Sequence, residues 1–465
     1  MQFSEKMTQL ETRATAALAS IYGLRMLGMF LILPIFAIYA ETLRGGNNHT
    51  LIGLALGAYG FMQVIFQLPF GMASDRFGRK KLIYLGLVMF ALGSVCAAMA
   101  QDIYMVIVGR AIQGAGAISA VVTALVADST REEHRTQAMA MIGATIGVTF
   151  AVSLVAGPIL NQWIGVPGIF WLTAVLAILA IGVVKFAVPE PLHAHFHSDA
   201  QAVPAKIGEV LRDKQLLRLN FGTFCLHGAQ MAMFMVVPFA IKHSTGMNEN
   251  THWKIYLPVL LISFVLMVPA IIYAEKKAKL KPVFISAVGL MLFTQIAFMF
   301  SLNSLWGIVA TLFSYFVAFN ILEASLPSLI SKMAPVAAKG TAMGVHNTAQ
   351  SFGMFLGAAL GGWLSHAYGS STVFVFCAVL MLIWFGLALG MQAPPSVKTK
   401  MFHLQAGYND AQAAKLVQDI RAMEGVYEVV AIPSETMLMV KLENQRSKAF
   451  QAALSQAIMN RIGES

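Results

Sequence analysis

Five ionisable residues lie well inside long apolar stretches of the sequence. They are Arg25, Arg110, His227, Glu323 and His346. Charge is costly in hydrocarbon, so an ionisable group at bilayer depth is a candidate functional residue. A carboxylate near histidines can take up and release protons, because histidine changes charge between about pH 5 and 8. These residue types indicate proton transfer, whereas an enzyme would need a Ser-His or metal-ligand constellation at a common depth, which the sequence lacks.

Three of these groups share one predicted layer of the membrane. At about 1.5 Å per residue, Arg25, His227 and Glu323 lie about 12–15 Å from the same membrane surface. We hypothesise a local network in which Glu323 carries a proton, Arg25 stabilises its charged form and His227 relays the proton. The alternative is a static ion pair between helices.

The other two buried groups have less specific surroundings in the sequence. Arg110 lies about 10 Å from the opposite surface. The alternative to a functional role is an arginine that packs between helices and bonds to backbone carbonyls. For His346 we expect a hydrogen-bonded histidine between two helices.

A second chemical signal is the charged segment GMASDRFGRKK, residues 71–81, between two apolar stretches. Its candidate residues are Gly71, Asp75, Arg76, Gly78, Arg79 and Lys80, together with Asp128 further along the chain. Cations alone would set membrane topology, but topology requires neither an aspartate nor glycines at fixed spacing. The segment therefore predicts a conformational latch, and the alternative is that its cations only set topology.

Each part of the predicted latch has its own physical reason. Gly71 is expected to let its helix closely approach a neighbouring helix backbone. Gly78 is expected to permit a tight turn. Asp75 is expected to stabilise the positive end of the helix that begins near Lys339, which would join the two halves of the protein when the pocket opens on the opposite side.

Apolar segments dominate the elements that must position these residues. Of the 465 residues, 57% are hydrophobic and 12% charged, and apolar runs of the length that crosses a bilayer recur along the chain. Twelve spans are predicted, at 16–40, 49–73, 82–101, 103–126, 137–162, 169–188, 217–242, 254–274, 282–301, 304–330, 340–365 and 371–391. The fold class is an all-α multi-pass membrane protein.

The distribution of Lys and Arg predicts the orientation of the chain. Twenty of these cations fall on one predicted side and three, Arg44, Lys242 and Lys254, fall on the other. Cytoplasmic loops are the ones enriched in Lys and Arg, so both termini and the central loop are predicted to be cytoplasmic. The net charge of +10 then indicates an anionic lipid surface as partner, and not nucleic acid.

The two halves of the chain repeat each other. Residues 137–160 resemble residues 341–364 with an offset of 204, which predicts two parallel six-helix halves around a central substrate site. The predicted domains are the N-terminal half 1–188, a linker 189–216, the C-terminal half 217–391 and a tail domain 392–465. The linker histidines His193, His195 and His197 are expected to be solvated, so no metal site is predicted.

The tail changes to alternating strands and amphipathic helices in the order βαββα, which resembles a ferredoxin-like fold. Its first loop, AGYND, lacks the Cys-x-x-Cys of small metal-binding domains. The tail is predicted to bind a regulatory ligand or to self-associate, and a passive appendage is the alternative.

Three motifs carry a resemblance to a known family. GMASDRFGRKKL (71–82) resembles motif A of the major facilitator superfamily, and GRAIQGAGA (109–117) resembles its helix-4 arginine motif. GVTFAVSLVAGP (147–158), with Gly147, Gly157 and Pro158, resembles the helix-5 motif of proton-driven antiporters. The likeness covers about residues 16–391.

The resemblance implies a central cavity lined by helices 1, 4, 7 and 10. It also implies that Arg79 pairs with Asp75 and Asp128, that Arg110 takes part in proton transfer or substrate gating, and that the helix-5 motif accompanies export. Gly147, Gly157 and Pro158 are expected to allow close helix packing and a bend.

We therefore predict a secondary active transporter of the bacterial inner membrane that exports a small organic or amphipathic compound against proton entry. It needs no cofactor beyond the proton gradient, and the sequence has no phosphate-binding loop of a primary pump. The alternatives are a proton symporter or facilitator for uptake, and a membrane receptor that signals through its tail domain.

Overall fold

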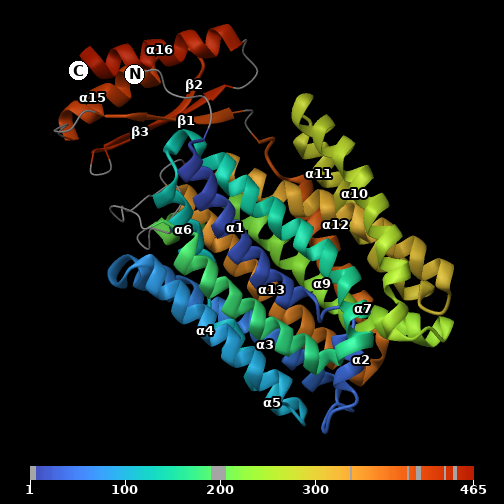
Figure 1. The fold of residues 1–465 in the computed structure, drawn as a ribbon. Helices are drawn as coiled ribbons and strands as arrows, with labels where there is room; N and C mark the ends of the chain where they lie inside the picture. Colours follow the sequence, from blue (N-terminus) through green and yellow to red (C-terminus); the bar gives the residue numbers. More distant parts are fainter. Residues whose placement is uncertain are drawn as a thin grey trace.

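The computed structural model describes residues 7–189, 206–335, 338–394, 397–404, 410–433, 436–443 and 448–464. It is a bundle of long helices with a small domain of strands and helices at one end (Figure 1). We call this end the domain side, where α3 and α12 end at Phe77 and Met333. The opposite end, where α3 begins at His49, is called the far side.

Seven helices form the N-terminal half. They are α1 (Gln9–Phe30), α2 (Phe36–Ala40), α3 (His49–Phe77), α4 (Arg79–Ala98), α5 (Ile103–Ala115), α6 (Ser119–Ser129) and α7 (Glu132–Phe186). The helix α7 contains two predicted spans, whose helical arms meet at Gly165 with a left-handed φ of 65°. That conformation costs little for glycine and so allows the chain to change direction there.

The C-terminal half follows the linker. Its helices are α8 (Ile207–Arg212), α9 (Lys214–Thr245), α10 (Trp253–Lys276), α11 (Leu280–Ser301), α12 (Leu305–Met333), α13 (Lys339–Tyr368) and α14 (Ser370–Leu389), with a short 3-10 helix η2 (Glu249–Thr251) before α10. Most of the predicted linker, including its three histidines, lies outside the described residues, and its last part forms α8.

Two predicted spans are interrupted. The span 16–40 breaks between α1 and α2, close to Pro34, whose ring nitrogen cannot donate a helical hydrogen bond. The span 103–126 breaks at residues 116–118, where a Cβ on Gly116 would lie 2.3 Å from the carbonyl oxygen of Gly86. Nine helical stretches of the described residues are long and apolar enough to cross a membrane, and the number of twelve stays a prediction.

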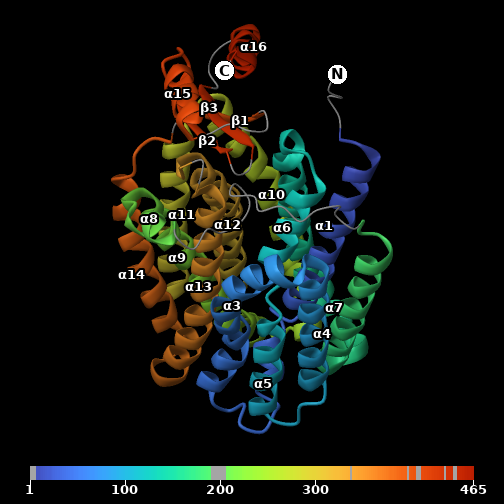
Figure 2. The same cartoon turned by 90° about the vertical axis from the view of Figure 1, so that its left-hand side faces the viewer.

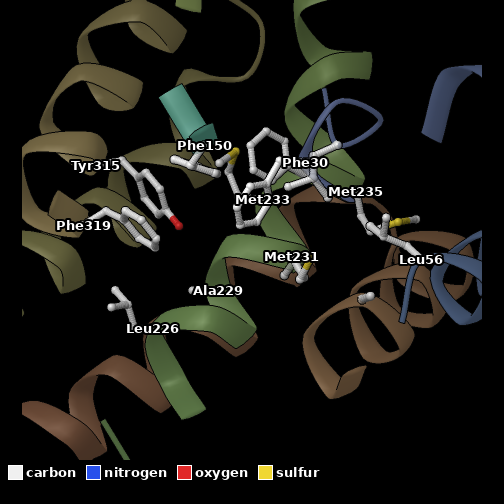
Figure 3. Close-up of a cluster of buried hydrophobic side chains, with 14 of the residues drawn as sticks. Phe30, Leu56, Phe150, Leu226, Ala229, Met231, Met233, Met235, Tyr315 and Phe319 are labelled. Carbon is white, nitrogen blue, oxygen red and sulfur yellow. The ribbon is translucent and has the colours of Figure 1, made fainter. Parts of the chain in front are cut away.

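Apolar side chains from both halves form one continuous core. Figure 3 shows its centre, where Phe30 and Phe150 of the N-terminal half lie near Met233 and Phe319 of the C-terminal half. The Phe150 ring lies 5.1 Å from that of Phe30 and 5.9 Å from that of Phe319, between ring centroids. These rings therefore join α1, α7 and α12 across the middle of the bundle.

The two halves are also in close contact at the far side. A Cβ placed on Gly362 of α13 would lie 2.3 Å from the carbonyl oxygen of His49 at the start of α3. The His49 ring stacks on Phe239 of α9 at 5.4 Å. Asn161 donates a hydrogen bond of 2.6 Å to Asn250. These contacts close the far side, and at Gly362 they leave no room for a larger side chain.

The C-terminal domain contains β1 (Val397–His403), α15 (Asp410–Arg421), β2 (Val426–Ile432), β3 (Met437–Glu443) and α16 (Lys448–Glu464). Its antiparallel sheet has the strand order β1-β3-β2, and Figure 2 shows the domain above the C-terminal half of the bundle. The predicted order βαββα is therefore present in the described residues.

Alternation along β3 gives the sheet two buried faces. Leu438, Val440 and Leu442 belong to the core that α15 and α16 cover. Met437, Met439 and Lys441 alternate with them and are also buried, with exposed fractions of 2% or less. Successive residues of a strand point to opposite faces, so this second face turns away from the two helices.

Candidate functional site in the centre of the bundle

A histidine and a carboxylate meet inside the C-terminal half. His227 of α9 lies with its Nε2 atom 3.2 Å from Oε2 of Glu323 on α12. The Nδ1 atom of His227 donates to the backbone oxygen of Thr223 at 3.0 Å, since a carbonyl can only accept. This bond fixes the ring, so Nε2 is the position at which the imidazole gains and loses a proton.

The Nε2 atom of His227 faces two different partners. The side-chain amide of Gln350 on α13 donates to it at 2.8 Å, which requires an unprotonated nitrogen. The Glu323 carboxylate, 3.2 Å from the same nitrogen, would accept a hydrogen bond from a protonated ring. The site can therefore hold the ring in either protonation state with a hydrogen-bond partner for each.

The Glu323 side chain is 39% exposed although it lies inside the bundle, whereas His227 is 4% exposed. Phe316 and Phe319 precede it by seven and four residues and share its face of α12. Both rings contact Phe150 of the N-terminal half, at 6.4 and 5.9 Å. Glu323 therefore lies between the halves, one helical turn from Phe319 toward the domain side.

His346 adds a second histidine to this region. Its Nδ1 atom lies 2.9 Å from Oγ1 of Thr223, so it links α13 to α9 as expected for a hydrogen-bonded histidine between helices. The ring is 5% exposed. Thr223 thus contacts both histidines, through its hydroxyl and its carbonyl group.

The predicted approach of Arg25 to Glu323 is wrong. Arg25 donates to Tyr59 Oη at 2.7 Å and to Ser119 Oγ at 3.1 Å, both within the N-terminal half. Depth placed the two charges in one layer, but α1 turns Arg25 toward α3 and α6 rather than toward α12. The predicted network therefore divides into a C-terminal acid site and a separate N-terminal arginine site.

Arg110 of α5 belongs to the arginine site. It donates to Oε1 of Gln113 at 2.9 Å, and Gln113 donates to Ser94 at 2.7 Å. Its guanidinium lies 5.1 Å from the centre of the Tyr59 ring. The bond goes to a side-chain amide, and not to the backbone carbonyls of the alternative prediction.

The charged segment forms an ion-pair network within the N-terminal half. Arg79 lies 3.0 Å from Asp128 of α6 and also pairs with Asp75, one helical turn before it. Ser74 accepts a further bond from Arg79 at 2.6 Å. The Arg79 side chain is 3% exposed and that of Asp128 is fully buried, so this pair is shielded from water.

The remaining latch residues lie around this network. Lys80 donates to the backbone oxygen of Val188 at 2.8 Å, and Arg76 lies over the ring of Phe77 at 5.5 Å. Gly78 has a φ of 98°, which L side chains rarely adopt, so the turn requires glycine. An added Cβ at Gly71 would make only ordinary contact with Ala120 at 3.5 Å, so the expected close backbone approach is wrong.

The predicted contact of Asp75 with the start of α13 is not formed. Among the described residues, the ion pair of Asp75 is with Arg79, and its side chain is 41% exposed. The prediction placed that contact in a state that closes the domain side. The described contacts between the halves at helix ends instead lie at the far side, through His49, Asn161 and their partners.

The two glycines of the helix-5 motif differ in how closely they are packed. A Cβ on Gly157 would lie 2.2 Å from the carbonyl oxygen of Leu31, so this glycine allows the break after α1 to contact α7. A Cβ on Gly147 would meet no atom within 4 Å, so the expected close packing there is wrong. Pro158 lies within the long helix α7.

Several hydrogen-bond partners in these sites were not predicted from the sequence. Tyr59 and Gln113 complete the arginine site, and Gln350 completes the acid site. A signal existed for Gln350, which follows His346 by four residues and so shares its helix face. Within the described chain, no group of three His, Cys, Asp or Glu residues is arranged to hold a metal ion.

The chain is similar in sequence to known membrane transport proteins. The sequence profile of the Major Facilitator Superfamily matches residues 18–358 and 279–405. The inner membrane transport protein YajR of Escherichia coli (strain K12) is 42% identical over 455 residues, which are 97% of this chain and 98% of YajR. An uncharacterized transporter of Buchnera aphidicola subsp. Acyrthosiphon pisum is 37% identical over 361 residues, which are 76% of this chain and 90% of that protein.

A solved structure supports the same fold. The crystal structure of a bacterial homolog to the human lysosomal transporter Spinster, in an inward-facing and occupied conformation, superimposes with a TM-score of 0.66. The superposition covers 82% of this chain and 97% of the chain of that transporter, and the two sequences are 12% identical. At this identity the likeness concerns the fold of the helical bundle alone.

Proposed function

Since the chain belongs to the major facilitator superfamily, whose members are membrane transporters, we propose that it exports a small organic or amphipathic compound in exchange for protons. The single observation that carries the proposal is the pair of His227 and Glu323 in the centre of the bundle. An ionisable pair at this depth has a cost that selection tolerates where it serves a function.

The pair has the geometry that a proton carrier needs. Glu323 is partly exposed and so can exchange protons with water, whereas His227 is buried behind it. A proton that enters at Glu323 can pass to Nε2 of His227, and the imidazolium then donates to the Glu323 carboxylate. Release of that proton leaves a neutral ring, to which Gln350 donates. Loading and release of one proton thus change the contacts between α9, α12 and α13.

The aromatic contacts support alternating access. Phe150 joins Phe316 and Phe319 across the halves, and these rings separate Glu323 from the closed far side. Rocking of the halves would part these rings and expose the same carboxylate to the other side, as expected for a site between two parallel repeats. In that state Asp75, which is free of α13 here, would approach the start of that helix.

The direction and location of transport complete the proposal. The helix-5 motif with Gly157 and Pro158 favours export, and the bias of Lys and Arg favours a cytoplasmic domain side with both termini. We place the protein in a bacterial inner membrane with twelve spans. The apolar and methionine-rich centre suits amphipathic compounds.

The C-terminal domain contacts a helix of the proton site. Lys441 donates to the backbone oxygens of Ala334 and Lys332 at 2.6 and 3.4 Å, at the end of α12. Since α12 also carries Glu323, we propose that this ferredoxin-like domain regulates transport through the position of α12. A polar cavity of about 210 Å³ between Tyr427 and Gln392 offers room for a small regulatory ligand, and self-association is the other proposed role.

The test measures proton flux in inside-out vesicles from cells that overproduce the protein. Addition of a transported compound should dissipate the acid-inside proton gradient in the wild type. Glu323→Gln should abolish this response, because an amide cannot carry the proton. Glu209→Gln, which changes an exposed carboxylate on α8, serves as the matched control and should respond like the wild type. An unchanged response in Glu323→Gln would contradict the proposal.

A further inference from the structure

Midway along its helices, the N-terminal half contains two buried positive charges and no carboxylate. Arg25 and Arg110 are 1% and 2% exposed. The acidic residues of 7–189 are Glu11, Glu41, Asp75, Asp102, Asp128, Glu132 and Glu133. All of them lie within a few residues of a helix end or in a connection between helices. The guanidinium charges of Arg25 and Arg110 therefore have no anionic side chain of the N-terminal half at their depth.

Both arginines are arranged around one ring. Their guanidinium carbons lie 5.7 and 5.1 Å from the centre of Tyr59, for Arg25 and Arg110 respectively. Arg25 also lies 5.7 Å from the centre of the Phe90 ring. An aromatic face attracts a cation, but the attraction is much weaker than that of a paired carboxylate. The rings orient the two charges without neutralising them.

The hydrogen bonds of the arginines are also incomplete. Their described partners are the hydroxyl groups of Tyr59 and Ser119 and the amide oxygen of Gln113, which are neutral. The Nε atoms of Arg25 and Arg110 are buried and have no hydrogen-bond partner. Buried donors are nearly always bonded in native proteins, so two orphaned guanidinium donors beside the same ring indicate a missing acceptor.

We propose that Arg25 and Arg110 bind the anionic headgroup of the transported compound, which is an amphipathic monoanion with a carboxylate or sulfonate group. This inference rests on the proposed transport function. A guanidinium fork matches such an oxyanion in shape and charge. Phe30 follows Arg25 by five residues and belongs to the apolar core between the halves. This core could contact the hydrocarbon part of an amphipathic substrate.

The charge of the substrate determines how much net charge each exchange moves across the membrane. One anion leaving for one proton entering moves two elementary charges in the same electrical direction. One cation leaving for one proton moves none. With an anionic substrate, transport should therefore respond steeply to membrane potential, because the energy of each charge that crosses the membrane changes in proportion to the potential.

The first experiment measures binding to the purified full chain in detergent by its thermal unfolding. The probes are octanesulfonate and octyltrimethylammonium, which have the same alkyl chain and opposite permanent charges, below their micelle-forming concentrations. Octanesulfonate should stabilise the wild type and the cation should not. Arg25→Gln and Arg110→Gln should each weaken the apparent affinity for octanesulfonate about tenfold or more, since each removes charged hydrogen bonds. Arg44→Gln, at an exposed arginine outside the bundle core, is the matched control.

A second pair of variants retains both arginines. Ser119→Asp would place a carboxylate within reach of Arg25, whose Nη1 lies 3.1 Å from the serine oxygen. It should abolish the stabilisation by octanesulfonate, because the site then contains its own anion. Ser119→Asn, which adds similar volume without charge, should retain most of it. Equal responses of the two variants would overturn the proposal.

The outcomes separate this inference from the proposed function. Failure of octanesulfonate to stabilise the wild type, with lipophilic cations driving proton exchange in vesicles, would overturn the anion site and leave proton-coupled export intact. Binding that depends on the arginines, without any proton exchange, would support the site and contradict the coupling. Equal stabilisation by chloride at the same concentration would overturn the amphipathic class of ligand.

Discussion

The two halves differ in the charges that they place at similar depth. The N-terminal half buries Arg25 and Arg110 around Tyr59 without a carboxylate. The C-terminal half pairs Glu323 with His227. One half thus has charge that a bound anion could balance, and the other has a group that a proton can neutralise. In the proposed mechanism, substrate and proton would act on different halves and would be coupled through the interface between them.

The helix ends of the two halves show a second difference. Asp128 lies in the last turn of α6, and Lys332 lies 204 residues later, at the offset of the sequence repeat. Asp128 accepts from Arg79 in a buried pair, whereas Lys332 donates to Glu275 in an exposed one. The two pairs have opposite polarity and unequal burial. Their energetic contributions are therefore expected to differ, and four predictions test this comparison.

The largest effect is expected for Asp128→Asn. This change leaves the buried Arg79 with only the partly exposed Asp75 and should lower the free energy of unfolding by about 3 kcal/mol. Thermal unfolding of the purified protein in detergent measures it. Asp75→Asn removes the exposed partner and should cost about 1 kcal/mol or less. Equal costs would break the proposed distinction between the buried and exposed partners.

The next effect concerns the glycines of the two repeated helices. A Cβ on Gly357 of α13 would lie 2.1 Å from the carbonyl oxygen of Gly228, whereas Gly147 of α7 has open space around it. Gly357→Ala should therefore destabilise the protein by about 2 kcal/mol through overpacking. Gly147→Ala is the matched control and should be neutral or slightly stabilising, as removal of a helical glycine predicts. Similar unfolding temperatures would contradict this contrast.

A third effect depends on pH and belongs to the N-terminal half. Burial alone would raise the pKa of Glu11, but hydrogen bonds from Arg131 and Thr8 lower it to about 2. The lowered pKa stabilises the folded protein fully above its ordinary value of 4.5, and the contribution is lost as the pH falls toward about 2. Stability should change by roughly 1–2 kcal/mol across this window, since Arg131 is partly exposed.

Unfolding measured between pH 2.5 and 5 tests this prediction. Glu11→Gln removes the titrating group and should flatten the profile in that window. The hydrogen bonds involved join the start of α1 to Arg131, at 2.8 and 2.9 Å from its backbone and side-chain nitrogens. A profile of Glu11→Gln as steep as that of the wild type would assign the dependence to other carboxylates.

The smallest effect is expected for Glu275→Gln. The Glu275 side chain is 46% exposed, and exposed ion pairs contribute less than about 1 kcal/mol. The predicted change in unfolding temperature is correspondingly small and should diminish further at high salt. A loss of unfolding free energy as large as that of Asp128→Asn would show that the two helix-end ion pairs stabilise the protein equally.

Much of the architecture could be predicted from the sequence. Hydropathy located most of the long helices to within a few residues, although α1 begins at Gln9 and two predicted spans are interrupted, and the alternating tail predicted the order βαββα. The pairing of Arg79 with Asp75 and Asp128 also agrees with the contact that the motif implied. The helices and the Arg79–Asp75 pair depend on local composition and short spacing, whereas the Arg79–Asp128 contact, between residues 49 apart in the chain, was implied by the family resemblance.

The sites were less predictable, because they depend on the rotation of each helix. Depth placed Arg25, His227 and Glu323 in one layer, but only two of them meet. A residue's distance along a helix follows from its position, whereas the direction of its side chain toward a neighbour depends on how whole helices pack. For the same reason Gly147 and Gly71 lack the close contacts that their type suggested.

The sequence by itself determined that the chain is a multi-pass helical protein with few ionisable groups at depth, since hydrophobicity and charge are properties of each segment alone. Only the tertiary structure decided which of those groups meet. It joined Glu323 to His227, gathered two arginines around Tyr59 and placed Lys441 at the end of α12. Such contacts join residues far apart in the chain, and only the packing of helices against one another determines them.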